Sequence, residues 1–151
     1  MAAGSLKHTV VHAAQLRVLN PGIRALLERG VLPPAYALLE TTGRRTGQAR
    51  RTPVGNGLDA DGRTFWLVAE HGRRAGYVRN LEAEPRVRVR LRDGTHPRGP
   101  RWREGTAHVL PDEDPRERQR RIAGRDPSRW VNAFVVRTLG TDLLVVRIDL
   151  D

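Results

Sequence analysis

The sequence predicts an α+β chain, mainly β, built on a sheet or small barrel of about six mostly antiparallel strands. Three observations support this: short apolar runs end in turn-forming residues, one segment alternates strictly between apolar and charged residues, and no regular β-α-β succession occurs. The chain has 151 residues, a length typical of one domain. We expect a single domain over 1–151, with an N-terminal helical segment over 1–30 and the barrel with its connecting helices over 36–151.

The first strands are predicted from apolar runs between turns. Pro33-Pro34 stops any preceding helix, and residues 36–42 then form a strand. A second strand over 52–58 meets a third over 64–70 across residues 59–62, whose Asp-Ala-Asp-Gly composition is that of a hairpin turn.

The second half of the chain begins with the clearest strand pattern. Val87, Val89 and Leu91 share one face, and the four arginines of residues 86–92 share the other. Further strands are expected over 101–110 and 142–150. Proline-containing caps and helical spacing predict helices within 8–30, over 77–81, over 115–124 and over 127–140.

The composition restricts the chemistry. The absence of cysteine excludes disulfides, thiolate metal sites and a cysteine nucleophile, and the histidines lack the spacing of a metal site, so we expect no metal. A net charge of +10 favours an anionic ligand or surface. No signal peptide or transmembrane run occurs, which predicts a cytoplasmic protein. Peripheral membrane contact and a homodimer stay open.

The most informative segment is residues 38–53, where an apolar strand leads into a glycine-bounded loop with four arginines. Gly43 and Gly47 permit positive φ angles that turn backbone N–H groups inward, and guanidinium groups bind phosphate or carboxylate in a bidentate manner. The loop is not a Walker A sequence. From the residues alone, an anion site and a solvated basic turn remain equally good interpretations.

A second segment joins a strand end at residues 67–72 to a helical turn at 77–81. Backbone groups at such a strand end can hydrogen-bond the edge of a flat heterocycle, and Tyr77 or Asn80 can lie beside its ring. Taken alone, His71 is more simply a loop histidine and Tyr77 a packing residue.

The two segments together, at this separation, resemble the deazaflavin (F420)-dependent nitroreductase family. The resemblance rests on residues 39–47, their continuation through Pro53, the strand end at Val68-Ala69, and residues 77–81. It implies a split β-barrel, similar to the barrels that bind flavin mononucleotide (FMN). It also implies binding of coenzyme F420 and hydride transfer from the reduced deazaflavin to a small organic acceptor, namely an enone, a quinone or a nitro compound.

The resemblance also assigns roles to residues. The arginines and Thr46 of the loop would meet the phosphate and glutamate tail, the strand end and Asn80 would lie along the ring, and Tyr77, His71 or solvent would supply a proton. The implied cofactor-binding set is Gly43, Arg44, Arg45, Thr46, Gly47, Arg50, Arg51, Thr52, Pro53, Val68, Ala69, His71, Gly72, Tyr77 and Asn80.

Other functions compete with this interpretation. FMN is the rival cofactor, because its phosphate suits the same loop. A barrel that binds F420, FMN, haem or a fatty acid without catalysis is the main alternative. Nucleic-acid binding is weaker, because aromatic residues make up 5% of the chain and do not interleave with the basic strand. We therefore expect no nucleic-acid partner.

Overall fold

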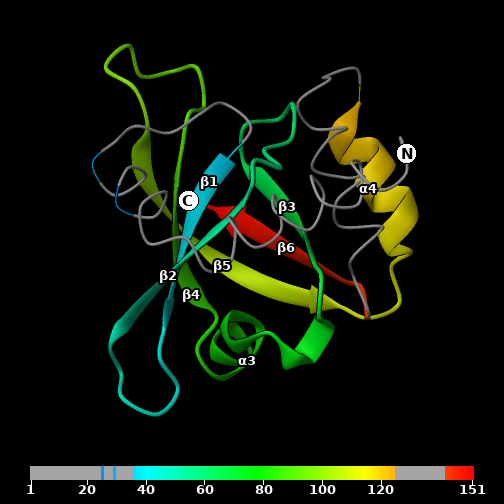
Figure 1. Cartoon of the computed structure of the whole chain (residues 1–151). Helices are drawn as coiled ribbons and strands as arrows, with labels where there is room; N and C mark the ends of the chain where they lie inside the picture. Colours follow the sequence, from blue (N-terminus) through cyan, green and yellow to red (C-terminus); the bar gives the residue numbers. More distant parts are fainter. Residues whose placement is uncertain (1–24, 26–28, 30–35, 125–141) are drawn as a thin grey trace, which may run out of the picture.

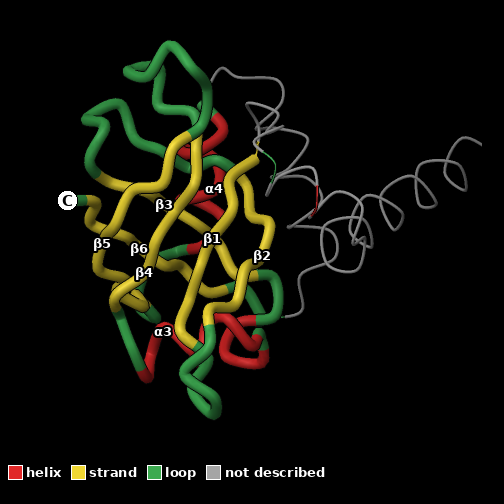
Figure 2. The backbone as a smooth tube through the Cα atoms, turned by 90° about the vertical axis from the view of Figure 1, so that its left-hand side faces the viewer, coloured by secondary structure: helices red, strands yellow, loops and turns green. Residues whose placement is uncertain are grey.

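The computed structural model of the chain describes residues 25, 29, 36–124 and 142–151. Six strands form one sheet in the order β2-β1-β4-β5-β6-β3, and every pairing is antiparallel. The sheet curls round one of its faces into a half-barrel (Figures 1 and 2). The strands are β1 Tyr36–Thr42, β2 Ala49–Gly55, β3 Thr64–Ala69, β4 Arg86–Leu91, β5 Arg101–Leu110 and β6 Leu144–Leu150.

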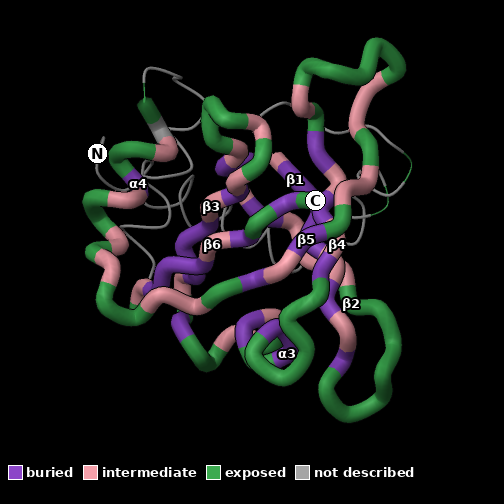
Figure 3. The backbone as a smooth tube through the Cα atoms, turned by 180° about the vertical axis from the view of Figure 1, so that it is seen from behind, coloured by how far each residue is buried: buried purple, intermediate pink, exposed green. Residues whose placement is uncertain are grey.

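The main hydrophobic core fills the inner face of the curl. Alternate residues of each strand point inward, so the buried residues form rows along the strands (Figure 3). On β4, Val87, Val89 and Leu91 are at most 4% exposed, as the alternation predicted. The arginines between them point to the outer face, which is thus the polar side of the sheet.

The two edge strands, β2 and β3, come together only near the turn that joins them. Leu58 forms an isolated bridge with Phe65, and the Trp66 N–H donates to the Gly57 carbonyl at 2.9 Å. Asp61 stabilises the predicted turn by accepting from the Arg63 and Thr64 N–H groups. Beyond this contact no ladder joins β2 to β3 in the described sheet, and the barrel is open along that side.

Short helices cover one end and part of the outer face. The 3₁₀ helix η1 Gly72–Arg74 and helix α3 Gly76–Ala83 follow β3, and α3 buries Val78, Asn80 and Leu81. Helix α4 Pro115–Ala123 begins at Asp114, whose carboxylate caps it as the sequence predicted. No helix in the described part of the chain is long and apolar enough to cross a bilayer.

Helix α4 packs on the outer face of β3 and β6. Ile122 lies against Val68 and Val145, and the guanidinium carbon of Arg118 lies 3.6 Å from the centre of the Trp66 ring. Trp66 lies half-buried on this outer face, because its neighbour Phe65 takes the inward position.

The predicted boundaries hold for β1 and β5 and shift elsewhere. Strand β2 begins at Ala49 rather than at Thr52, because Arg50 and Arg51 pair with Thr41 and Glu40. The helical turn predicted over 77–81 is a longer helix preceded by η1. The helices predicted within 8–30 and over 127–140 lie outside the described residues, apart from isolated positions in the first.

Candidate functional site

The predicted basic loop is an exposed hairpin between β1 and β2 (Figures 1 and 3). The Gly43 N–H donates to the Gln48 carbonyl at 2.7 Å, and the Gly47 N–H donates to the Gly43 carbonyl at 2.7 Å. Both glycine N–H groups therefore close the turn and are used within the hairpin.

The two glycines of the hairpin are required for different reasons. Gly47 has the expected positive φ, at 71°, but Gly43 does not have one. A Cβ on Gly43 would lie 3.0 Å from Thr46 Oγ1 and 3.1 Å from the Gln48 carbonyl oxygen. Close contact across the hairpin, rather than backbone conformation, selects glycine at position 43.

Asn80 joins the hairpin to helix α3. Its Oδ1 accepts hydrogen bonds from the Arg44 backbone N–H at 3.2 Å and from Arg44 Nη1 at 3.0 Å. Its Nδ2 donates to Thr41 Oγ1 at 3.2 Å. Asn80 and Thr41 are 6% and 2% exposed, so the bond between them is shielded from water, whereas the two bonds to Arg44 are partly buried. The two sequence segments that suggested a site are thus in direct contact.

Arg50 and Arg51 point to opposite faces of β2. Arg50 is paired with Thr41, on the inner side where Asn80 lies, and its Cγ is 3.6 Å from where a Cβ of Gly43 would be. Arg51 is paired with Glu40 on the outer face. Adjacent residues of a strand alternate between faces, so the tail-binding role implied for both arginines places them on two different surfaces.

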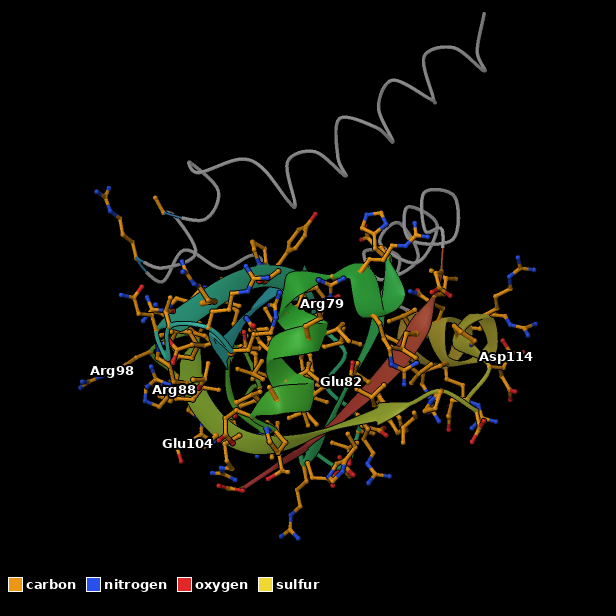
Figure 4. The ribbon with its side chains drawn as sticks, turned by 90° about the horizontal axis from the view of Figure 1, so that it is seen from below. Arg79, Glu82, Arg88, Arg98, Glu104 and Asp114 are labelled. Atoms are coloured by element: carbon orange, nitrogen blue, oxygen red, sulfur yellow. The ribbon has the colours of Figure 1, made fainter. Side chains whose placement is uncertain are left out.

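On the outer face, a glutamate neutralises the neighbouring arginines. Glu40 bonds Arg51 at 2.9 Å and Arg88 at 2.8 Å, and both guanidinium groups lie within about 5 Å of the Trp102 ring centre, at 5.1 and 4.9 Å. Along one row of the sheet Glu104, Arg88, Glu40 and Arg51 alternate in charge. Figure 4 shows Arg88 and Glu104 on the outer side of the curl, with α3 on the inner side.

The pKa of Glu40 reports this environment. Burial alone would raise it, but the hydrogen bonds and charges of Arg51 and Arg88 lower it below its ordinary value. The carboxylate is therefore ionised at neutral pH. The outer face is a compensated ladder of charges rather than a continuous positive stripe.

The hairpin arginines have no such compensation. Arg44, Arg45 and Arg50 form no ion pair with any residue that the structure describes, and the anionic partner nearest to them in sequence, Glu40, is shared by Arg51 and Arg88. One short hairpin thus carries three positive charges that have no carboxylate partner within the described structure.

The residues predicted beside the ring lie at the same end of the barrel as the hairpin (Figure 1). Ala69 is fully buried on the inner face, whereas the Val68 side chain lies under α4 on the outer face. Gly72 has φ 53°, and a Cβ there would lie 2.6 Å from the Asp142 carbonyl oxygen. Tyr77 is half-buried against the core, and His71 is exposed.

The structure therefore divides the predicted site residues. Arg44, Arg45, Thr46 and Arg50 cluster in the hairpin next to Asn80. The side chains of Arg51, Pro53 and Val68 belong to the outer face, and Thr52 faces inward opposite Leu39. Among the described residues no group of three metal-ligating side chains occurs.

The sequence interpretation missed Thr41. The signal was present: Ala37, Leu39 and Thr41 occupy the inward positions of β1, so the alternation places a polar hydroxyl where an apolar side chain is expected. A buried polar residue needs a partner, and Asn80 is that partner.

Comparison with known proteins identifies the family of the chain. The family model described as F420H(2)-dependent quinone reductase matches residues 16–151. The chain belongs to this family. It is accordingly an F420-dependent oxidoreductase, and the predicted enzyme class and cofactor are confirmed. No curated protein matches the chain.

Solved structures confirm the split β-barrel. The F420-H2 dependent reductase FDR-A is 22% identical over 80% of this chain and 96% of its own, with a TM-score of 0.54. The conserved hypothetical protein Rv2991 from Mycobacterium tuberculosis is 23% identical over 83% and 79%, with a TM-score of 0.55. The haem storage protein HutZ from Vibrio cholerae is 14% identical over 89% and 91%, with a TM-score of 0.54.

The residues present fit coenzyme F420. Its tail bears a phosphate and glutamate carboxylates, which are the groups that bind guanidinium most strongly. The hairpin offers Arg44, Arg45 and Arg50 without competing carboxylates among the described residues. Arg44 is also held in place by a neutral amide.

Proposed function

We propose that Arg44, Arg45 and Arg50 bind the anionic tail of coenzyme F420 and that the enzyme reduces a quinone-type acceptor. The observation that supports this most directly is the lack of a carboxylate partner for these three arginines within the described structure, in contrast to the paired Arg51 and Arg88. Planar guanidinium groups match the paired oxygens of phosphate and carboxylate. The family description supports the quinone class.

The ring of the coenzyme would lie at the open side of the barrel between β2 and β3. Both strands are edges of the sheet in the described part of the chain, and the unpaired backbone groups of a sheet edge can hydrogen-bond a heterocycle. Because Val68 points away, it would contribute through its backbone alone, next to Ala69. The contact between Asn80 and Arg44 supports a tail site and a ring site that adjoin at one end of the barrel.

The reduced coenzyme, when bound, supplies the hydride. The chain's contribution is to hold donor and acceptor in a reactive arrangement and to exclude water. A quinone becomes a hydroquinone by taking up one hydride and one proton. Tyr77 is the first side chain to test as the proton source, because it is half-buried against the core, whereas His71 is exposed.

A fluorescence titration with oxidised coenzyme F420 tests the tail site. We expect saturable binding at low micromolar concentration, and a loss of about tenfold for Arg44→Ala or Arg50→Ala, the effect of one charge-assisted contact. Arg86→Ala is the matched control, because Arg86 is paired with Asp151 on the outer face. Equal losses for the coenzyme and for FMN would contradict tail recognition.

The acceptor is tested by oxidation of the reduced coenzyme in the presence of a quinone, an enone and a nitro compound. We expect turnover with the quinone. A protein that binds the coenzyme and turns over none of the three would be a non-catalytic binder, and turnover of the enone or nitro compound alone would contradict the quinone assignment.

A further inference from the structure

Asn80 is a buried amide that uses both ends of its side chain to join distant segments. Its oxygen accepts two hydrogen bonds from Arg44, 36 residues away, and its nitrogen donates to Thr41, 39 residues away. Both Arg44 donors, backbone and guanidinium, converge on one oxygen. Arg44, the second residue after β1, is thereby fixed to the end of β1 and to α3.

An amide and a carboxylate would differ in effect at this position. A carboxylate can accept from Arg44 equally well, but it would form an ion pair and neutralise the guanidinium. The amide holds Arg44 in place and leaves its positive charge available. Glu40, on the outer face, has the opposite effect on Arg51 and Arg88.

We propose that Asn80 is the positioning residue of the tail site, which fixes Arg44 without neutralising it, and that Asn80 acts through Arg44 rather than by contact with the deazaflavin ring. This inference rests on the proposed function, and it reassigns a residue that the sequence resemblance placed along the ring. Arg44 can only donate, so it fixes which end of the amide faces it, and Thr41 completes the arrangement by accepting the amide hydrogen.

The arrangement also sets the distance between the two halves of the site. Tyr77 and Asn80 are three residues apart on α3, so they lie on neighbouring parts of one helix face. Tyr77 packs against the main core, and Asn80 contacts the hairpin. A rigid helix therefore fixes the hairpin relative to the place where the ring would lie.

Two probes separate the tail from the ring: oxidised coenzyme F420 and the deazaflavin riboside that lacks the phosphate tail. Asn80→Asp keeps the acceptor oxygen and adds a charge, and the Thr41 hydroxyl can donate to the second oxygen. We expect it to bind the coenzyme about tenfold more weakly, with a shallower salt dependence and unchanged riboside binding. Asn56→Asp is the matched control, because Asn56 is equally buried, at 6% exposure, and accepts from Leu58 at a distant turn.

A double-mutant cycle and hydrogen exchange complete the test. In an Arg44→Ala background, adding Asn80→Ala should lower the affinity for the coenzyme by less than a further twofold, because the two residues act together. Asn80→Ala should also speed exchange of the Arg44 backbone amide.

Three results would overturn the inference: additive losses in the cycle, a riboside loss as large as the coenzyme loss, or an unchanged exchange rate at Arg44. If the wild-type protein binds neither probe, the proposed function fails, and the exchange measurement still decides whether Asn80 holds the hairpin.

Discussion

Replacing Arg50 and Arg51 by alanine, one at a time, should separate coenzyme binding from stability. The two residues are adjacent and chemically identical, but they project to opposite faces of β2. Arg50→Ala removes a guanidinium that has no ion-pair partner among the described residues. It should lower the affinity for the coenzyme about tenfold, which is about 1.4 kcal/mol of binding free energy. We expect it to leave the unfolding free energy nearly unchanged.

Arg51→Ala should do the reverse. It removes a 2.9 Å ion pair with Glu40 and a contact with the Trp102 ring. Because the Arg51 side chain is 33% exposed, solvent screening limits the combined loss to about 1 kcal/mol. For a domain of this size that corresponds to a fall in Tm of about 2–4 °C. Coenzyme affinity should stay within about twofold of the wild type.

The assays are a coenzyme titration by fluorescence and unfolding by urea or heat, run on both variants and the wild type. Equal loss of coenzyme affinity in the two variants would refute the division of the hairpin into two faces. Loss of stability in Arg50→Ala alone would refute it as well.

Three further predictions concern stability. Burial alone would raise the pKa of Asp93, but hydrogen bonds from Thr95 and Arg101 lower it from 3.8 to about 2. The ionised form therefore stabilises the fold by about 2 kcal/mol above pH 4. In urea unfolding, Asp93→Asn should be less stable than the wild type by this amount at pH 7, and the difference should shrink as the pH falls towards 2. Gly72→Ala should lower the free energy of unfolding by at least about 1 kcal/mol, because Gly72 has a φ of 53° and lies close to the Asp142 carbonyl. Gly76→Ala, at an open position in α3, should be neutral or stabilising. Equal melting temperatures for the two variants would contradict this. Removing the cap with Asp114→Ala should cost about 1 kcal/mol in unfolding free energy, and an unchanged value would show that packing alone fixes the start of α4.

Most of the sheet could be predicted from the sequence because one face of each strand is buried. Strands β1 and β5 were predicted with the boundaries that the structure shows. The start of β2 was not, because Ala49, Arg50 and Arg51 have no apolar alternation. Their strand conformation depends on cross-strand pairing with Thr41 and Glu40, which local sequence does not reveal.

The site was predictable in composition and only partly in geometry. The glycine-bounded cluster of arginines identified the hairpin, but whether Arg50 or Arg51 faces the inner side depends on the strand register. The bond from Arg44 to Asn80 joins residues 36 positions apart. Such a contact depends on the packing of α3 against the barrel, so local propensity cannot indicate it.

The alternation along β2 makes the length of the hairpin matter more than most of its side chains. An insertion or deletion of one residue between Gly43 and Gln48 that slipped the register of β2 would exchange the two faces. Arg51 would then point towards Asn80, and Arg50 would point towards Glu40 and Trp102. Natural variants and engineered libraries should therefore tolerate substitution at exposed hairpin positions outside the proposed tail site, such as Gln48, far better than any change in the number of residues.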